Sequence, residues 1–512
     1  MSKSVFSRHN ISFTLVKMVF LVVVFFMVFV HAMQTPIDHD EHQYIAAAKL
    51  TADQGLLPYD DYRFVHMPYS VFINAVVFSF TDYLLSSARL LNAISFFGLL
   101  LLLFSFTRQL FADKNRWIQL ALGAGAISLL LFNPVVQNTM GKSWTFDLPL
   151  LISTGAVLML FNLHSGHTNR KLFVIGLLLA LATGIRFQFV FIAFAVFVYI
   201  LWNYVKGALK GPRPMSHLVA GGLLAILPLL LLAANQPGGF IFDIYTFHAK
   251  IDLQYKQQEL TFIERSSRLG GKLLKNHTAI IVALAALFVG GGFVFRQYKT
   301  RKTNEIVVVF LFLLPALLFI ALGKIVLFQY LYPLVVFTVF VIVAAFAGLG
   351  SRQKVAAALF SVLVVLNMVL GIKDGGWNKP DSPEQWTAMT FNGTSKDLAK
   401  LCKDCLVLTL SPAAVLESPE TSIYPEFVTT PFIWRASALV PEDLREAHQV
   451  VTFSTLEDFL EQNPPDAIVT GFERPEYEQS FVNYAKKMGY TEENLNGGKV
   501  YIKKLMAEEV YD

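Results

Sequence analysis

The sequence predicts an α-helical polytopic membrane protein that carries a small α/β domain after its last helix. The chain has 512 residues, of which 54% are hydrophobic and only 15% are charged, whereas soluble domains carry about a quarter charged residues. Its apolar residues gather in runs that approach the roughly 20 residues needed to cross a bilayer. From residue 374 onward the chain is polar, with short apolar runs typical of buried strands.

The apolar runs predict about eleven transmembrane helices. We place them at 13–33, 89–107, 117–133, 148–163, 172–185, 187–204, 217–234, 278–295, 305–322, 331–348 and 354–372. The stretch 68–82 is apolar but short. We expect it to form a helix that lies along or dips into the outer face, and a true span is the alternative.

The distribution of Lys and Arg predicts the orientation of the chain. Basic residues precede the first span and then occupy alternate loops: Lys3 and Arg8, 108–116, 170–171, 206–213, 296–302 and 352–354. Cytoplasmic loops are the basic ones, so we expect a cytoplasmic N-terminus in the cytoplasmic (inner) membrane. The transmembrane domain is then 1–373, with external loops 34–88, 134–147 and 235–277, and residues 374–512 form an external domain. The basic residues are too scattered for nucleic-acid binding.

The polar tail has the pattern of an α/β domain. Buried strands are predicted at 406–410 and 467–470, a closing strand at 499–502, and an amphipathic helix at 475–488 that ends before Gly489. The tail also holds both cysteines of the chain, Cys402 and Cys405. One pair cannot complete a four-ligand zinc site, so we expect a short-loop disulfide or two inert thiols.

A cluster of acids and histidines follows the first span directly, from Asp38 to Tyr44. A charge at the centre of a bilayer helix costs about 2.5–3.5 kcal/mol, so this cluster is expected at the membrane surface. Carboxylates and imidazoles beside a hydrocarbon boundary suit chemistry on a substrate that is itself partly lipid. A solvated loop without chemistry is the alternative.

Several short motifs occur in a particular order along the predicted topology. They are Asp40-Glu41-x-x-Tyr44, Gly55, His66-Met67-Pro68, Arg89, Asp147 and Tyr330-Leu331-Tyr332-Pro333. In these motifs residues 10–350 resemble the GT-C superfamily of integral-membrane glycosyltransferases, especially the protein O-mannosyltransferases and the bacterial lipid A aminoarabinose transferases. The chain departs from the family pattern at Met67, where a second proline is usual, and at Val65, where some relatives have an acid.

The resemblance implies a glycosyltransferase of the hexosyl or pentosyl class with a polyprenyl-phosphate sugar as donor. The acceptor would be a lipid, glycan or protein of the cell envelope. Phosphate is a good leaving group, so this reaction needs one base rather than the two carboxylates of glycoside hydrolysis. We expect Asp40 to be that base, with Asp147 and Glu41 as further catalytic residues. No cofactor and no metal ligand is assigned, and a divalent metal remains an open alternative.

The candidate substrate-binding residues are Tyr44, His66, Arg186, His248, Lys324 and Tyr330. Arg186 suits phosphate because a guanidinium can bind it through two hydrogen bonds. Structural alternatives remain open: Asp147 could cap a helix, Arg186 could anchor a span at the headgroups, and Tyr330 could belong to an interfacial aromatic belt. Arg89 is expected to be a structural partner of a carboxylate.

Three other functions fit parts of the sequence. A transporter or flippase would place ionisable residues in the middle of broken helices, whereas here they gather at the external ends of the spans. A non-catalytic envelope assembly protein would act through its tail. An oligosaccharide ligase or polymerase would differ mainly in its donor.

Overall fold

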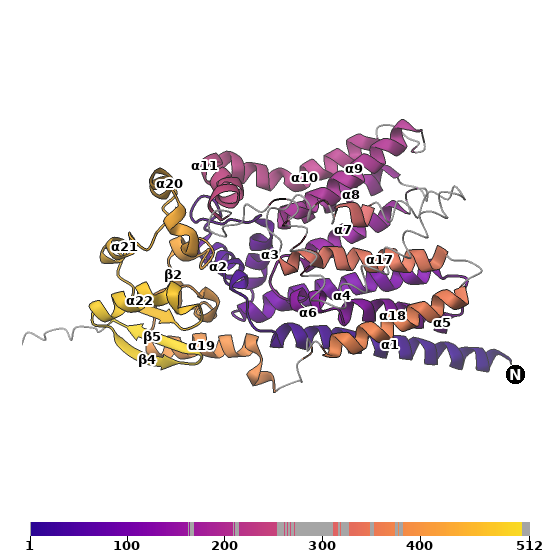
Figure 1. The fold of residues 1–512 in the computed structure, drawn as a ribbon, viewed down its shortest axis with the longest axis horizontal. Helices are drawn as coiled ribbons and strands as arrows, with labels where there is room; N and C mark the ends of the chain where they lie inside the picture. Colours follow the sequence, from indigo (N-terminus) through magenta and orange to yellow (C-terminus); the bar gives the residue numbers. More distant parts are fainter. Residues whose placement is uncertain are drawn as a thin grey trace, which may run out of the picture.

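The computed structural model places a bundle of long helices beside a small sheet domain at one end (Figure 1). It describes residues 2–161, 163, 168–207, 209, 214–252, 311–315, 327–348, 353–373, 377 and 382–503, together with 261, 264, 267, 271 and 318. The predicted span 278–295, most of 305–322 and the candidate residue Lys324 lie outside the described residues.

Among the residues that the structure describes, six helices are long and apolar enough to cross a membrane, and they coincide with six predicted spans. They are α1 (Ser2–Gln34), α4 (Leu84–Leu110), α8 (Thr168–Ile185), α9 (Val190–Val205), α10 (Pro214–Asn235) and α17 (Tyr332–Gly348). Three further predicted spans correspond to α5 (Arg116–Leu131), α7 (Asp147–Leu160) and α18 (Gln353–Lys373). The chain is therefore a multi-pass membrane protein, as its hydropathy predicted.

Small residues allow two of these helices to pack closely. A side chain on Gly176 of α8 would place its Cβ 2.0 Å from the carbonyl oxygen of Leu218, and one on Gly221 of α10 would lie 2.0 Å from that of Phe173. Glycine at such crossings lets helix backbones approach where larger residues would separate them. Helix α17 lies inside the bundle, and its side chains from 335 to 345 are buried.

Short helices cover one end of the bundle. They are α2 (His39–Gln54), α3 (Tyr69–Phe78), α6 (Pro134–Thr139), α11 (Pro237–Ile241), the π-helix η2 (Phe242–Asp252), and the 3₁₀ turns η1 (Phe187–Phe189) and η4 (Phe328–Leu331). Helix α3 is the element expected at 68–82. It has 10 residues, a length of about 15 Å that falls short of the roughly 30 Å hydrocarbon core.

The C-terminal domain is built on a five-stranded sheet with the order β2-β1-β3-β5-β4. Strands β2 (Thr421–Ile423), β1 (Cys405–Thr409) and β3 (Ala467–Thr470) are parallel, and β5 (Gly498–Ile502) and β4 (Thr491–Leu495) continue the sheet antiparallel. Its helices are α19 (Thr387–Leu401), α20 (Glu442–Ala447), α21 (Leu456–Gln462) and α22 (Pro475–Lys487). Four 3₁₀ turns lie in its described residues: η6 (Pro383–Gln385), η7 (Pro412–Ala414), η8 (Pro425–Phe427) and η9 (Trp434–Leu439).

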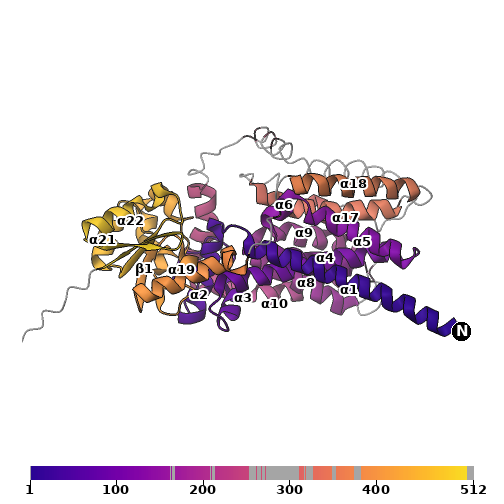
Figure 2. The ribbon, with the colours of Figure 1, turned by 90° about the horizontal axis from the view of Figure 1, so that it is seen from below.

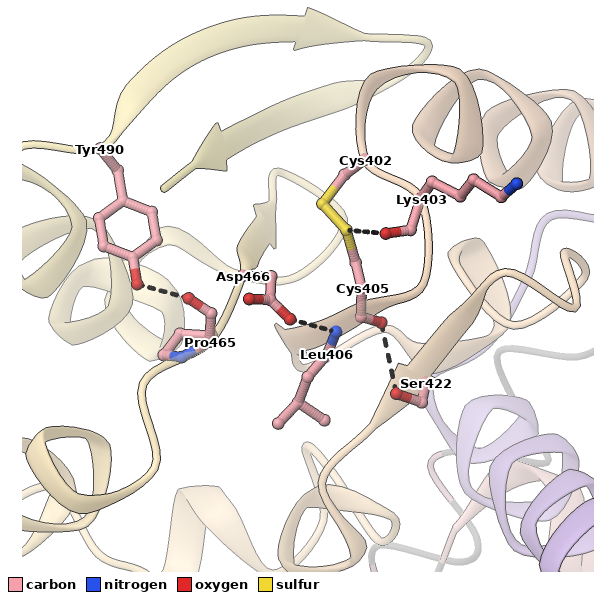
Figure 3. The surroundings of a disulfide bond; sticks show 8 residues. All are labelled: Cys402, Lys403, Cys405, Leu406, Ser422, Pro465, Asp466 and Tyr490. Atoms are coloured by element: carbon pink, nitrogen blue, oxygen red, sulfur yellow. Dashed lines mark hydrogen bonds between the residues drawn. A yellow bond between two sulfur atoms is a disulfide. The ribbon is translucent and has the colours of Figure 1, made fainter. Parts of the chain in front are cut away.

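The predicted strands β1, β3 and β5 and helix α22 are confirmed, whereas β2 and β4 were missed. Strand β4 is acidic and mostly exposed, so it lacks the apolar pattern that marks a strand in a sequence. Cys402 and Cys405 form a disulfide at the junction of α19 and β1 (Figure 3). Of the two alternatives for the cysteines, the disulfide is therefore the one observed.

The C-terminal domain packs directly on the end of the bundle where α2 and α3 lie (Figure 2). Glu417 accepts hydrogen bonds from the backbone N–H of Leu85 at the start of α4 (2.7 Å) and from the amide of Asn392 (2.8 Å). Burial raises the pKa of Glu417 to about 7. The backbone N–H of Ala413 donates to Nδ1 of His42, 3.3 Å away. The two parts of the chain thus share one polar interface.

Candidate active site

The acidic cluster forms the beginning of α2. Asp38 is the N-cap residue: its carboxylate accepts a hydrogen bond from the N–H of Asp40 (3.1 Å), and its own N–H donates to Oε2 of Glu41 (3.1 Å). This reciprocal capping box satisfies backbone donors that a helix otherwise leaves unpaired. The cap accounts for Asp38 and part of Glu41, and it leaves the carboxylate of Asp40 available.

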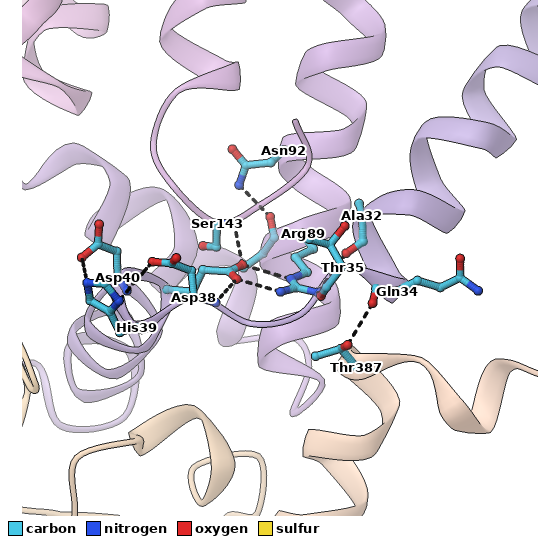
Figure 4. A network of polar contacts seen from close by, with 12 residues as sticks. Ala32, Gln34, Thr35, Asp38, His39, Asp40, Arg89, Asn92, Ser143 and Thr387 are labelled. Carbon is cyan, nitrogen blue, oxygen red and sulfur yellow. Dashed lines mark hydrogen bonds and ion pairs between the residues drawn. The ribbon is translucent and has the colours of Figure 1, made fainter. Parts of the chain in front are cut away.

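Glu41 and Arg89 form a fully buried ion pair, and Figure 4 shows Arg89 beside Ala32 and Thr35. Nε and Nη2 of Arg89 donate to the two carboxylate oxygens at 3.0 and 2.7 Å, and Nη1 donates to the carbonyls of Ala32 and Thr35. Burial opposes ionisation of Glu41, but the charge and hydrogen bonds of Arg89 outweigh it, so the pKa of Glu41 is lowered. The expectation that Arg89 is the structural partner of a carboxylate is confirmed.

The loop between α6 and α7 is held by two buried carboxylates. Glu41 accepts the N–H of Ser143 (2.8 Å) through Oε1. Asp147 accepts the N–H of Gly141 (2.8 Å) and the hydroxyl of Tyr332 (2.5 Å), one on each oxygen. Asp147 is the first residue of α7, yet these bonds go to the loop and to α17. Both oxygens of Asp147 are therefore engaged by groups of the protein.

The same loop fixes Arg186. Nη1 of Arg186 donates to the hydroxyl of Thr145 (3.0 Å) and to the carbonyl of Trp144 (3.2 Å), and its guanidinium lies 3.6 Å from the ring centre of Phe146. Thr145 has a φ of 52°, which is rare for a β-branched residue and costs of the order of 1–3 kcal/mol. The strained loop presents its hydroxyl to the cation that we expect to bind phosphate.

Asp40 and Arg186 face a common region. Tyr44 and Tyr330 each interact electrostatically with both of them. The carboxylate of Asp40 is 23% exposed. Among the residues that the structure describes, its Oδ1 accepts no hydrogen bond. The candidate base and the candidate phosphate cation are thus neighbours, although they lie far apart in the sequence.

Two histidines complete this region. The ring of His66 lies 5.3 Å from that of Tyr44 and 5.8 Å from that of His248, measured between centroids. Nε2 of His248 donates to the carbonyl of Val65 (2.5 Å), which ties η2 to the segment before α3. Of the predicted binding residues, the structure therefore brings together Tyr44, His66, Arg186, His248 and Tyr330.

An apolar cavity opens beside Tyr330. It has a volume of about 20 Å³ and lies between the start of α9 and α17. Its walls include Phe189, Ile192, Pro333 and Phe337. The cavity is small, but its residues form an apolar wall, and Tyr330 joins this wall to the polar groups around Arg186.

One group of side chains has the composition of a metal site. Within the described part of the chain, ligand atoms of Asp38, His39 and Asp40 lie within 4.8 Å of one another. However, the guanidinium of Arg435 lies 3.5 Å from Nε2 of His39. A divalent cation on these ligands would face that fixed positive charge.

Sequence reasoning missed the contribution of the C-terminal domain to this site. Arg435 in η9 reaches His39, and the ring of Phe432 lies 5.6 Å from that of His66. These contacts join residues almost 400 positions apart, and neither residue belongs to a recognisable motif. Thr145 was missed for a similar reason, because its role depends on the backbone conformation of its loop.

The helix bundle with its capping sheet domain has the same overall fold as two membrane proteins of known structure. No family model and no curated protein matches the sequence. The chain superposes on ArnT from Cupriavidus metallidurans in the apo state with a TM-score of 0.60 and 11% identity, over 95% of this chain and 97% of that one. Against ArnT bound to undecaprenyl phosphate the TM-score is 0.62, with 11% identity over 97% and 98%.

A second group of similar structures comes from an archaeon. The Archaeoglobus fulgidus oligosaccharyltransferase in complex with Zn and sulfate superposes with a TM-score of 0.52 and 14% identity, over 94% of this chain and 73% of that one. The resemblance drawn from the sequence motifs is therefore confirmed at the level of the fold.

Proposed function

We propose that this protein is a membrane glycosyltransferase that moves a sugar from a polyprenyl-phosphate donor to a lipid, glycan or protein acceptor of the cell envelope. One observation carries the proposal. Asp40, whose Oδ1 accepts no hydrogen bond from the described residues, and Arg186, whose guanidinium is held by its neighbours, share a polar region that adjoins an apolar cavity through Tyr330. The solved ArnT complex, whose ligand is undecaprenyl phosphate, supports a lipid-linked donor.

The donor would bind across the boundary between this cavity and the polar region. The polyprenyl chain would lie against the apolar residues beside Tyr330, and its phosphate would accept hydrogen bonds from Arg186 and Tyr330. Charge-assisted bonds of a guanidinium to phosphate are short and directional. They would strengthen as the phosphate gains charge in the transition state. His66 and His248 would contact the sugar or the phosphate from the opposite side.

Asp40 would accept the proton of the acceptor hydroxyl or amine as that group attacks the anomeric carbon. The bond between this carbon and the phosphate oxygen breaks, and the lipid phosphate leaves with the electron pair. One base and one displacement invert the anomeric centre. Glu41 and Asp147, whose oxygens are engaged by Arg89, Ser143, Gly141 and Tyr332, would act as positioning residues.

The reaction would occur at the external face of the cytoplasmic membrane. The basic loops predict a cytoplasmic N-terminus, and the same alternation puts α2, the loop before α7 and the C-terminal domain on the external side. These are the elements that carry the candidate site. Labelling of cysteines introduced at exposed positions of the C-terminal domain, in intact cells, tests this orientation.

The direct test combines the purified protein with a polyprenyl-phosphate sugar and measures release of the lipid phosphate. Mass spectrometry of envelope glycans and lipids, with and without the gene, then identifies the acceptor. We expect a sugar that is lost from one envelope component when the gene is absent. Sugar-lipid movement across vesicles without any transfer would instead support a flippase.

An oligosaccharide ligase is a second candidate, because the archaeal oligosaccharyltransferase also shares the fold. The two candidates differ in donor. Competition between a lipid-monophosphate sugar and a lipid-diphosphate oligosaccharide in the same assay separates them. We expect turnover of the monophosphate donor.

Arg186→Gln is expected to weaken donor use by about 10–100-fold in kcat/KM, because a charge-assisted hydrogen bond contributes about 1.5–3 kcal/mol. Arg186→Lys should retain part of the activity, since the charge remains while the paired geometry is lost. The measurement is the donor dependence of the initial rate. Arg108→Gln serves as the matched control, because Arg108 lies in the last turn of α4, away from the candidate site. Equal rates for wild type and Arg186→Gln would remove Arg186 from the site.

We expect chelation of divalent metals to leave transfer unchanged. Arg435 already places a positive charge beside Asp38, His39 and Asp40, so the two carboxylates do not need a cation to balance them. The measurement is the transfer rate after dialysis against a chelator. A loss that added metal restores would show that a cation displaces Arg435 and takes part in the reaction.

A further inference from the structure

Arg435 reaches from the C-terminal domain to the first turn of α2. It lies in η9, its side chain is 13% exposed, and its guanidinium stacks 4.6 Å from the ring centre of Phe432. Nη1 lies 3.5 Å from Nε2 of His39, and Nη2 lies 4.0 Å from a carboxylate oxygen of Asp252. Arg435 thus contacts His39, the residue that directly precedes the proposed base, Asp40.

The hydrogen-bonding capacity of these groups decides where the proton of His39 lies. A guanidinium can only donate, so Nε2 of a histidine bonded to it has to accept. The proton of neutral His39 is then on Nδ1, which faces Oδ1 of Asp38 at 3.6 Å. The tautomer follows from this contact rather than from an observed hydrogen.

This arrangement has a consequence for Asp40. Oδ1 of Asp40 lies only 3.3 Å from Nε2 of His39. At this distance it would accept a hydrogen bond if Nε2 carried a proton. With Nε2 accepting from Arg435, His39 has no proton to offer there. Oδ1 of Asp40 indeed accepts no hydrogen bond from the described residues.

We propose that Arg435 is a positioning residue that holds His39 in the Nδ1–H tautomer and thereby keeps Asp40 free to act as a base. Without Arg435, Nε2 of His39 would carry the proton and donate it to Asp40. A carboxylate that already accepts a strong hydrogen bond takes a further proton less readily. This inference rests on the proposed function, in which Asp40 is the base.

The proposal makes the C-terminal domain a part of the active site. The contact joins residues 396 positions apart, and it forms only when η9 is docked on α2. His42, Lys142 and Glu473 also interact electrostatically with the residues of this cluster. Undocking of the domain would therefore change the base directly, beyond any effect on the binding of an acceptor.

A double-mutant cycle in the full-length protein tests this role. Arg435→Gln should lower kcat by about tenfold with the KM for both substrates unchanged, as expected for coupled neighbours. In a His39→Ala background the same substitution should cost less than about threefold, because no imidazole remains to donate to Asp40. Arg435→Lys, which still donates, should keep most of the activity. Arg474→Gln, an exposed arginine of the same domain, is the matched control.

Equal losses from Arg435→Gln with and without His39 would overturn the proposal, and so would a loss confined to KM. Arg435→Met keeps the aliphatic length that packs on Phe432, and melting temperatures are compared for both variants, so a folding defect is recognised as such. Other results would refute the proposed function itself: transfer retained by Asp40→Asn, or no transfer by the wild-type protein. An intact Asp40 dependence with no coupling between His39 and Arg435 would refute this inference alone.

Discussion

Asp40→Asn is expected to abolish measurable transfer while leaving the protein folded. A positioned general base contributes about 10²–10⁴-fold to a rate, and asparagine keeps the shape of aspartate without its basicity. The helix cap is supplied by Asp38, and Oδ1 of Asp40 makes no hydrogen bond that the substitution would break. The measurement is kcat of the purified variant, together with its melting temperature.

Asp53→Asn provides the control for this experiment. Asp53 lies on the same helix, is 45% exposed and pairs with Lys49 at 3.1 Å. We expect wild-type transfer from this variant. Transfer by Asp40→Asn at a rate near that of wild type would refute the assignment of Asp40 as the base.

Arg89→Met is expected to destabilise the protein by about 3–5 kcal/mol, the usual cost of breaking a buried ion pair by removing one partner. The substitution would leave the charge of Glu41 buried, and it would release the carbonyls of Ala32 and Thr35. Glu41→Gln should also destabilise the protein, because Arg89 would keep its charge without a partner. The measurement is the unfolding of each variant in detergent.

The double variant Glu41→Gln/Arg89→Met should recover much of this loss, since it leaves neither charge unpaired. Lys114→Met serves as the control, because its pair with Asp113 lies at the surface, with the two side chains 28% and 65% exposed, and surface pairs contribute about 0–1 kcal/mol. If Glu41→Gln were as stable as wild type but inactive, Glu41 would be a catalytic residue, and its positioning role would be contradicted.

The membrane fold could be predicted from the sequence because the bilayer constrains it strongly. Helices α1, α4, α8, α9, α10 and α17 each appear as an apolar run of nearly the length that a span needs. In the C-terminal domain, β1 and β3 were predicted because they are buried and apolar. Strand β4 was missed because an exposed edge strand needs no apolar side chains, only a neighbour to pair with.

The candidate site was predicted in part, for a similar reason. Asp40, Tyr44, His66 and Arg186 stand in short motifs, so their residue types and order carry the information. Asp40 and Glu41 are adjacent in the sequence, and no motif predicts that their side chains point to different surroundings. On α2 one side chain points to Arg89 in the protein interior and the other to the polar region, and only the packing of α4 decides this.

The sequence by itself determined the class of this protein, since hydropathy and the alternation of basic loops depend on composition alone. It also determined which residue types meet the membrane surface after the first span. The tertiary structure decided which acids have their oxygens engaged by Arg89, Tyr332 and backbone N–H groups, and that Oδ1 of Asp40 accepts no hydrogen bond from the described residues. It also decided that Arg435 of the C-terminal domain reaches His39. The physical reason is that hydrogen bonding and burial depend on neighbours in space, and those neighbours come from segments far apart along the chain.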